Sequence, residues 1–434
     1  MKGRLPEPGK ALGEIFRSAL QAVEPGRLVR EHLPSVLENS RREGLGRILA
    51  VGFGKASWGM ARALEEALGG TLQGGLVITP YGHGGPLERI LLREAAHPVP
   101  DEAGLRATEE LLGMLRGADE ETLVVCLISG GGSALLERPL EGLSLQDLQG
   151  TTELLLKAGA DIQEFNALRK HLSAVKGGRL AQAAWPAHVV SLIISDVLGD
   201  RVDVIASGPT APDESTFGDA WRVLEKYGLL QRVSPAVVSA LREGLEGKRP
   251  ETPKPADRVF GRVENLLIGS NRLALQGAAR RALELGYQVQ VLTTALRGEA
   301  REAARWLARK ALQAKARGCR GLCLLSGGET TVTVRGPGLG GRNMELALAF
   351  CLQVQGQEGI SLLSAGTDGT DGPTPAAGAV VDGLTARRAR RLGLEPEVFL
   401  QRNDSYNFFK RAGGLFVTGP TGTNVMDIQV ILLQ

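Results

Sequence analysis

The sequence predicts an α/β protein in which a parallel sheet lies between layers of helices. Three short runs are dominated by apolar residues: Arg47–Gly52, Thr122–Ile128 and Val189–Ser195. Glycine-rich turns and segments with helical periodicity, such as Ala56–Leu68, separate these runs. Apolar strands that alternate with helices in this way are typical of parallel sheets covered on both faces.

The first half of the chain is expected to form one domain over residues 1–243. Ala11–Val23 has helical periodicity and stops before Pro25. Ser144–Ala184 is predicted to be largely helical on the same criterion. The stretch Glu243–Arg262 then combines three prolines with mixed charge. Residues 244–262 are therefore predicted to be a linker.

The second half is expected to form a smaller α/β domain over residues 263–434. Its predicted strands are Asn265–Gly269, Tyr287–Thr293, Gly321–Ser326 and Ile360–Leu363. Its predicted helices are Asn271–Gly286, Glu299–Arg317 and Asn343–Leu352. The alternation in Thr330–Arg335 predicts a β-ribbon, and Gly414–Leu433 is expected to hold two strands around a glycine turn.

Composition excludes several classes of protein. The 434 residues carry 51 basic and 48 acidic side chains, a net charge of +3, so nucleic acid is not an expected partner. No window approaches the ~20 apolar residues of a membrane span, and the first residues lack a signal-peptide core. Four cysteines in a chain of this length do not predict a disulfide scaffold. The sequence therefore predicts a reduced, cytoplasmic protein.

Two residue types are rare and gather beside glycine loops. The chain has 12 Lys against 39 Arg, and only 8 Asn. Lys55 follows the turn Gly52-Phe-Gly54 at the end of a predicted strand. Five Asn lie in or beside turns rich in Gly, Ser or Thr: Asn271, Asn343, Asn403, Asn407 and Asn424. We regard these rare residues as candidates for catalysis or ligand binding.

The loop Ser129-Gly130-Gly131-Gly132-Ser133 is the first candidate site. Glycines after a buried strand let successive N–H groups turn toward one point, and such a nest binds anions. The alternative is a tight turn, which needs fewer glycines. Gly54 and Lys55 are predicted to lie at the same sheet edge, where open α/β sheets bind ligands. The alternative for Lys55 is a solvated surface position.

A second candidate site surrounds Arg342, which closes the loop Gly336-Pro-Gly-Leu-Gly-Gly and opens a predicted helix. A guanidinium presents paired donors to a phosphate or a carboxylate. Glu329 and Glu345 are either ion-pair partners of Arg342 or ligands of a metal or hydroxyl, and the sequence favours neither interpretation.

Three Asp carboxylates are also candidate site residues. Asp368 and Asp371 lie in one Gly/Thr turn after a predicted strand, and Asp196 follows another strand. Such carboxylates hold Mg²⁺ or accept a proton from a hydroxyl, although Asp also caps turns. The five histidines show no metal-binding spacing, and a GxSxG motif is absent. Glycine nests combined with Lys, Arg and Asp side chains are typical of sites that catalyse phosphoryl transfer.

Six motifs together resemble the glycerate 2-kinases of the MOFRL type: SGGGSALL, NALRKHLSAVKGGRLA, ISDVLGD…IASGPT, GGRNMELAL, AGTDGTDGPT and TGPTGTNVMD. The resemblance runs from about Ile48 to the C-terminus. It implies ATP-dependent phosphorylation of D-glycerate at its 2-hydroxyl, giving 2-phosphoglycerate. It also implies a Rossmann-like N-terminal domain, a smaller α/β C-terminal domain and an active site in the cleft between them, with Lys55 and Arg342 as catalytic residues.

The expected mechanism places the ATP phosphates on the Ser129–Ser133 loop with Gly54, neutralised by Mg²⁺. Lys55 and Arg342 contact the transferring phosphoryl group and the glycerate carboxylate, in an order left open, and Asp196 or Asp368 orients or deprotonates the hydroxyl. The expected metal ligands are Asp196 and Asp371, and the expected substrate-binding residues are Asn271, Glu329, Asn343 and Asp371.

Two alternative functions stay open at this point. An NAD(P)H-dependent hydroxypyruvate reductase is disfavoured because no complete dinucleotide fingerprint is present. A sugar-acid-binding protein without turnover is the other. The expected partners are D-glycerate and ATP, with no nucleic acid and no membrane, and a homodimer is an open alternative to a monomer.

Overall fold

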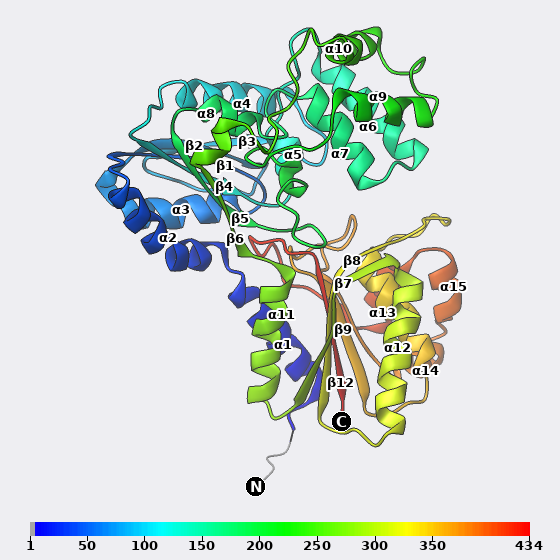
Figure 1. Cartoon of the computed structure of the whole chain (residues 1–434). Coiled ribbons are helices and arrows are strands. Elements are labelled where there is room, and N and C mark those ends of the chain that lie inside the picture. The colour runs from blue at the N-terminus through cyan, green and yellow to red at the C-terminus, as the bar shows by residue number, and fades with distance from the viewer. Residues whose placement is uncertain (1–4) are drawn as a thin grey trace. The chain divides into compact units, whose positions relative to one another are not determined.

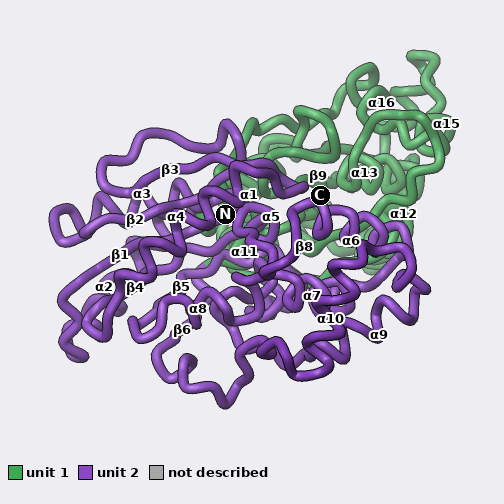
Figure 2. The backbone as a smooth tube through the Cα atoms, turned by 90° about the horizontal axis from the view of Figure 1, so that it is seen from above, with its two compact units in different colours: residues 1–24, 269–434 green, residues 25–268 purple. Residues whose placement is uncertain are grey.

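The computed structural model describes residues 5–434, and its chain divides into two compact units (Figures 1 and 2). Unit 1 combines Gly269–Gln434 with the N-terminal segment up to Glu24, and unit 2 is Pro25–Ile268. Each unit is built on its own six-stranded sheet. The expected α/β class is confirmed in both.

The sheet of unit 2 has the strand order β3-β2-β1-β4-β5-β6. Neighbours from β3 through β5 are parallel. This is the Rossmann order, in which the chain changes direction of winding between β1 and β4. The strands are β1 (Arg47–Phe53), β2 (Leu72–Pro80), β3 (Ile90–Ala95), β4 (Thr122–Ile128), β5 (His188–Ile194) and β6 (Val263–Gly269).

Helices cover both faces of this sheet, with α2 and α3 on one face and α4 and α8 on the other (Figure 1). All seven residues of β4 are buried, as expected for a central strand between helix layers. The helices of unit 2 are α2 (Pro25–Arg42), α3 (Ser57–Leu68), α4 (Glu102–Leu115), α5 (Gly132–Leu135), α6 (Leu145–Ala158), α7 (Ile162–Leu172), α8 (Arg179–Ala184), α9 (Phe217–Lys226) and α10 (Pro235–Leu245).

A second core in unit 2 joins α6, α7, α9 and α10. Reciprocal capping boxes start three of these helices: Ser144 with Asp147 starts α6, and Asp161 with Glu164 starts α7, while Thr216 and Asp219 start α9. Each box satisfies N–H groups that a helix start leaves unpaired. The predicted helical character of Ser144–Ala184 is confirmed.

The sheet of unit 1 has the order β11-β10-β9-β12-β8-β7 and is mixed. β7 is parallel to β8, and the other pairs are antiparallel. The strands are β7 (Gln288–Glu299), β8 (Leu322–Thr331), β9 (Ile360–Gly366), β10 (Gly378–Asp382), β11 (Leu415–Phe416) and β12 (Asp427–Leu433). β11 and β12 confirm the two strands predicted in Gly414–Leu433, but they pair with other strands rather than with each other.

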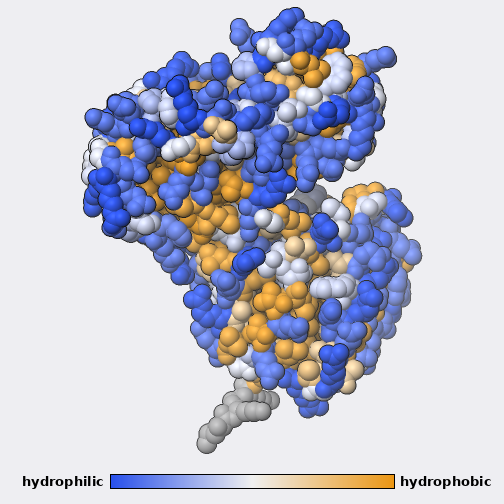
Figure 3. All heavy atoms as spheres, viewed as in Figure 1, coloured by the Kyte–Doolittle hydropathy of each residue, from blue (hydrophilic) through white to orange (hydrophobic). Residues whose placement is uncertain are grey.

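Helices also cover both faces of the second sheet, with α1 and α11 on one side and α12 and α13 on the other (Figure 1). They are α1 (Pro8–Ala22), α11 (Asn271–Glu284), α12 (Ala300–Ala316), α13 (Arg342–Gln353), α14 (Thr385–Arg391), α15 (Pro396–Gln401) and α16 (Ser405–Ala412). Figure 3 shows a mostly hydrophilic face, with an apolar area of unit 1 over the edge strand β7, where Val291 is 46% exposed.

The compact units do not follow the expected boundaries of 1–243, 244–262 and 263–434. Helix α1 packs on α11 in unit 1, and a Cβ added at Gly277 would lie 2.5 Å from that of Ala22, so the two helices approach closely. Strand β6 completes the first sheet. The segment expected as a linker lies within unit 2, where the Thr252 hydroxyl donates to Asp213 over 2.9 Å.

The β-ribbon predicted for Thr330–Arg335 is wrong. Strand β8 ends at Thr331, and the following residues have no regular structure. Asn403, in a left-handed conformation with φ 54°, accepts hydrogen bonds from the N–H groups of Arg335 and Gly336. A side-chain amide holds this segment in place of a second strand.

Among the described helices, none combines the length and the apolar character that a bilayer crossing requires.

Candidate functional site

In unit 2, the predicted residues meet where β1, β4 and β5 end. Lys55 follows β1, and its backbone N–H donates to the Gly130 carbonyl over 2.8 Å. The next N–H, of Ala56, donates to the Ser129 hydroxyl over 3.0 Å. The two loops flank the point where the winding of the sheet reverses, which is where ligands bind in this fold. The structure therefore joins the two loops that the sequence predicted separately.

Glycine at three of these positions permits contacts that any side chain would block. A Cβ on Gly54, whose φ is 121°, would lie 2.3 Å from the Ser129 hydroxyl oxygen. A Cβ on Gly130 would lie 2.2 Å from Oδ2 of Asp196, and one on Gly131 would meet the His97 ring at 2.9 Å. The loop therefore brings main chain, a carboxylate, an imidazole and the Lys55 side chain to one place.

The Ser129–Ser133 loop has the conformation of a nest rather than of a long helix start. Gly131 is left-handed, with φ 83°, and α5 beyond it has only four residues. No acceptor among residues 5–434 pairs with the N–H of Gly130, Gly131 or Ser133. These donors are available to an anion, while the helix dipole adds little over so short a helix.

In unit 1, Arg342 is held by two carboxylates. Its Nε and Nη2 donate to Asp427 over 2.6 and 2.9 Å, and its Nη1 donates to Glu329 over 2.6 Å. Asp427 is fully buried, whereas the Glu329 side chain is 44% exposed. Burial alone would lower the pKa of Arg342, but Asp427 and Glu329 outweigh it and raise the pKa above its ordinary value. The guanidinium is fixed and permanently charged.

Sheet pairing explains this convergence. Asp427 opens β12, and its register partners are Gly328 in β8 and Gly366 in β9. Because β12 is antiparallel to both, its start lies at the same edge as their carboxyl ends. Asp427 is a site residue that was not predicted from the sequence. The available signal was an acidic residue between a Gly/Thr turn and an apolar strand.

Asp371 and Asn343 form the start of helix α13. The two carboxylate oxygens of Asp371 accept the N–H groups of Asn343 and Met344 over 3.0 and 2.8 Å. Asp371 is 2% exposed. Burial raises the pKa of Asp371 to about 7, although both N–H groups act in the opposite direction. This is the geometry of a helix cap next to Arg342.

The remaining predicted residues of unit 1 lie around the same edge. Asn271 is buried, and its amide donates to the carbonyls of Val425 and Asp427. Asp368 is half-buried and accepts from the N–H of Thr370, as an Asx turn does. Gly366 separates the carboxylates of Asp368 and Asp427, since a Cβ there would lie 3.2 and 3.5 Å from them.

Glu329 and Glu345 have different partners in the structure. Glu329 pairs with Arg342. Glu345 does not, because it pairs with Arg301 over 2.7 Å and also accepts from Asn403. Within residues 5–434, no group of three or more His, Cys, Asp or Glu side chains is arranged to hold a metal ion.

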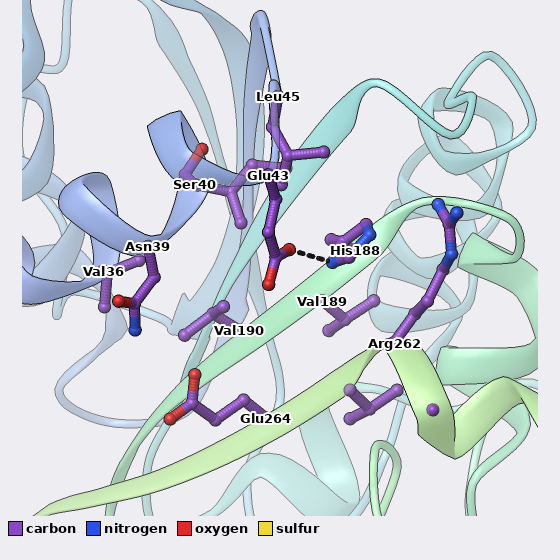
Figure 4. A pocket seen from close by; sticks show the side chains of 13 residues that line it. Val36, Asn39, Ser40, Glu43, Leu45, His188, Val189, Val190, Arg262 and Glu264 are labelled. Carbon is purple, nitrogen blue, oxygen red and sulfur yellow. Dashed lines mark ion pairs between the residues drawn. The ribbon is translucent and has the colours of Figure 1, made fainter.

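The pocket in Figure 4 lies at the other end of the first sheet. It is lined by Asn39 and Ser40 of α2 and by His188 and Val263, which open β5 and β6. Glu43 pairs with His188 over 2.8 Å. None of the predicted site residues lies there, and the amino ends of strands are not where this fold binds its ligands.

Together, a Rossmann-ordered sheet and a glycine-rich loop beside Lys55 at its switch point define an α/β protein with a candidate anion-binding site. A family model described as a domain of unknown function, DUF4147, matches residues 11–242, and the model of the MOFRL family matches residues 322–427. A D-glycerate 2-kinase of Thermotoga maritima is 47% identical, with 99% of each chain covered.

Two further relatives complete the comparison. A solved structure of a glycerate kinase from Thermotoga maritima has a TM-score of 0.89 at 46% identity, covering 99% of this chain and 100% of its own. A protein of Agrobacterium vitis, named provisionally as a hydroxypyruvate reductase, is 43% identical, with 98% of this chain and 94% of its own covered. The chain belongs to the MOFRL-type glycerate kinase family, and the resemblance predicted from its motifs is confirmed.

Proposed function

We propose that the protein transfers the γ-phosphoryl group of ATP to the 2-hydroxyl of D-glycerate, giving 2-phosphoglycerate and ADP. The observation that carries this proposal is the meeting of Lys55, the Ser129–Gly132 loop and Asp196 at the switch point of the first sheet. Phosphoryl transfer needs positioned cations and N–H donors more than it needs a protein nucleophile.

The nest is assigned to the ATP phosphates. The N–H groups of Gly130, Gly131 and Ser133 supply donors, and the glycines let phosphate oxygens approach the main chain. Lys55 adds a mobile point charge beside the nest. Together they neutralise charge on the phosphoryl oxygens as the bond to the leaving group breaks.

Asp196 fits a magnesium ion and Asp371 does not. Mg²⁺ in kinases is held by one or two carboxylates together with substrate phosphates, so a three-carboxylate cage is not required. Asp196 is half-buried beside the nest. Asp371 is buried and uses both oxygens on the α13 main chain. When bound, the ion neutralises phosphate charge. We assign Asp196 to it and treat Asp371 as a cap.

Arg342 is assigned to an anionic group of the substrates, either the transferring phosphoryl group or the glycerate carboxylate. Asp427 fixes the orientation of the Arg342 side chain before the anion arrives, so little reorganisation of that side chain is needed when the anion binds. Glu329, Asn343 and Asn271 surround it and are proposed to bind or orient the substrate. Asn271 does so through the main chain of Asp427, to which its amide donates.

The group that accepts the hydroxyl proton is Asp196 or Asp368. Both are half-buried, so each retains access to a substrate. The action of the two sites together in one cleft stays a prediction, as do the cytoplasmic location and a homodimer. The reductase and the sugar-acid-binding protein are the alternatives that the following experiment addresses.

Purified protein with ATP, Mg²⁺ and D-glycerate is expected to produce ADP and 2-phosphoglycerate, resolved from 3-phosphoglycerate by NMR. Lys55→Ala and Arg342→Ala should each lower kcat by about 10²-fold or more, with an unchanged circular dichroism spectrum. NADH oxidation by hydroxypyruvate without ADP formation would establish the reductase instead. Tight D-glycerate binding without product would establish the binding protein.

A further inference from the structure

A recess in unit 2 contains a guanidinium that no carboxylate neutralises. It is lined by Ser133 of the nest, Arg169 of α7 and Glu137, together with apolar residues. The Arg169 guanidinium stacks on the Phe165 ring, with Cζ 4.2 Å from the ring centroid. Within residues 5–434 it forms no ion pair and no hydrogen bond. Its donors around the edge of the guanidinium plane therefore have no protein acceptor.

The nearest carboxylate is already used. Both oxygens of Glu137 are bonded, Oε2 to the Lys176 ammonium over 2.7 Å and Oε1 to the Ser173 hydroxyl over 2.6 Å. Lys176 is fully buried. Burial lowers the pKa of Arg169, and the attraction of Glu137 opposes this only in part. Glu137 pairs with Lys176, so Arg169 has no carboxylate of its own.

A second unpaired donor lies three residues earlier on the same helix. Asn166 is 5% exposed, and its Nδ2 has no partner among the described residues. Its Oδ1 accepts from the Ser207 hydroxyl over 3.0 Å, and that hydroxyl is 2.9 Å from the Ser133 hydroxyl. Residues three apart lie on one side of a helix. A buried donor without an acceptor is costly, and native proteins rarely keep one without a purpose.

We infer that Arg169, with Asn166 and Ser133, binds an anionic oxygen group of one of the two substrates, either a nucleotide phosphoryl group or the acceptor carboxylate. The inference rests on the proposed function for the identity of those substrates. The ligand must accept hydrogen bonds, because the side chains of Arg169 and Asn166 and the N–H of Ser133 present donors. An anionic ligand complements Arg169, because the one carboxylate that lines the recess already pairs with Lys176. Ser133 belongs to both the recess and the nest, so the two sets of donors are continuous.

The first test variant replaces the unpaired Nδ2 donor of Asn166 and keeps its Oδ1 acceptor. Asn166→Asp keeps the oxygen that accepts from Ser207 and exchanges the unpaired amide for a carboxylate. Arg169→Met removes the charge and retains length. Arg138→Gln is the matched control, because Arg138 also adjoins Glu137 but pairs with Glu109 at the surface. Calorimetric titrations with ADP and, separately, with D-glycerate measure the affinity of each protein.

Asn166→Asp and Arg169→Met are each expected to weaken one of the two ligands by about 10- to 100-fold, as loss of a charge-assisted hydrogen bond does. Arg138→Gln should bind both as the wild type does. Loss of ADP affinity identifies a phosphoryl group, and loss of D-glycerate affinity identifies the carboxylate.

If Asn166 has only a structural role, Asn166→Asp should not weaken the binding of either ligand. The new carboxylate would pair with Arg169 and raise the melting temperature, while both affinities stay within twofold of the wild type. That result would overturn the inference. A wild type that binds ADP and D-glycerate but forms no 2-phosphoglycerate would instead refute the proposed kinase activity, and the recess would still be tested by the affinities.

Discussion

The two carboxylates that hold Arg342 should differ greatly in their effect on stability. Asp427→Asn removes one of two hydrogen bonds to the guanidinium and leaves a buried amide against a cation. Removing one partner of a buried pair costs about 3–5 kcal/mol. The Arg342 side chain is 34% exposed, so solvent recovers part of this. We expect a loss of about 2–4 kcal/mol in the free energy of unfolding.

Glu329→Gln is the matched control for Asp427→Asn. It removes a carboxylate from the same guanidinium, but the Glu329 side chain is 44% exposed. Exposed pairs contribute about 0–1 kcal/mol, so stability should change by less than about 1 kcal/mol. Because Asp427 sets the orientation of Arg342, Asp427→Asn should also lower kcat by about 10²-fold, the cost of a small misplacement of a catalytic group.

Urea unfolding followed by tryptophan fluorescence and circular dichroism measures the stability of each variant, and steady-state kinase assays measure kcat. Equal stability losses in the two variants would refute the argument that burial of Asp427 controls the pair. Wild-type kcat in a folded Asp427→Asn protein would remove Asp427 as the residue that positions Arg342.

Two further predictions concern unit 2. Gly130→Ala places a Cβ 2.2 Å from Asp196 Oδ2, so the carboxylate or the nest must move, and kcat should fall more than tenfold. The control is Gly150→Ala at an exposed position of α6, where a Cβ meets no neighbouring atom and should stabilise the protein by about 0.5–1 kcal/mol. Burial alone would raise the pKa of Glu251, but hydrogen bonds from His171 and the Phe217 N–H lower it to about 2. A depressed carboxyl pKa stabilises the fold above the ordinary value near 4.5 and loses this effect as pH falls through about 2. The Glu251 side chain is 37% exposed, so Glu251→Gln should lower the free energy of unfolding by only about 1 kcal/mol at pH 6. The difference between variant and wild type should vanish near pH 2. Urea unfolding at the two pH values measures it, and an equal difference at both would contradict the prediction.

Local patterns predicted the strands and turns of the site correctly because their signals are short-range. The apolar runs before Gly54 and Ser129 mark strands, and glycines mark the turns. The assignment of Lys55 and the Ser129 loop to one sheet edge follows from the rule that parallel strands end together. Their direct contact through the Gly130 carbonyl required the strand order, which places β4 next to β1.

Long-range pairing accounts for what the sequence did not reveal. Helix α1 joins unit 1 because it packs on α11, which begins far along the chain. Asp427 is 85 positions from Arg342, and only the register of β12 with β8 and β9 brings them together. The rare Asn residues were correctly singled out, but Asn271 and Asn403 bond the main chain of neighbouring segments. In both cases the rare residue makes a specific hydrogen bond within the protein.

Burial separates the carboxylates of the two units into two groups. Asp371 and Asp427 are almost inaccessible, and their oxygens accept main-chain N–H groups or the guanidinium. A carboxylate bonded and buried in this way can hold a helix or a cation, but a substrate hydroxyl has little access to it. Asp196 and Asp368 are half-buried and lie beside glycines that leave room for a ligand. The partial exposure of Asp196 and Asp368 supports the proposal that one of them is the base, because a proton acceptor must be reached by its substrate.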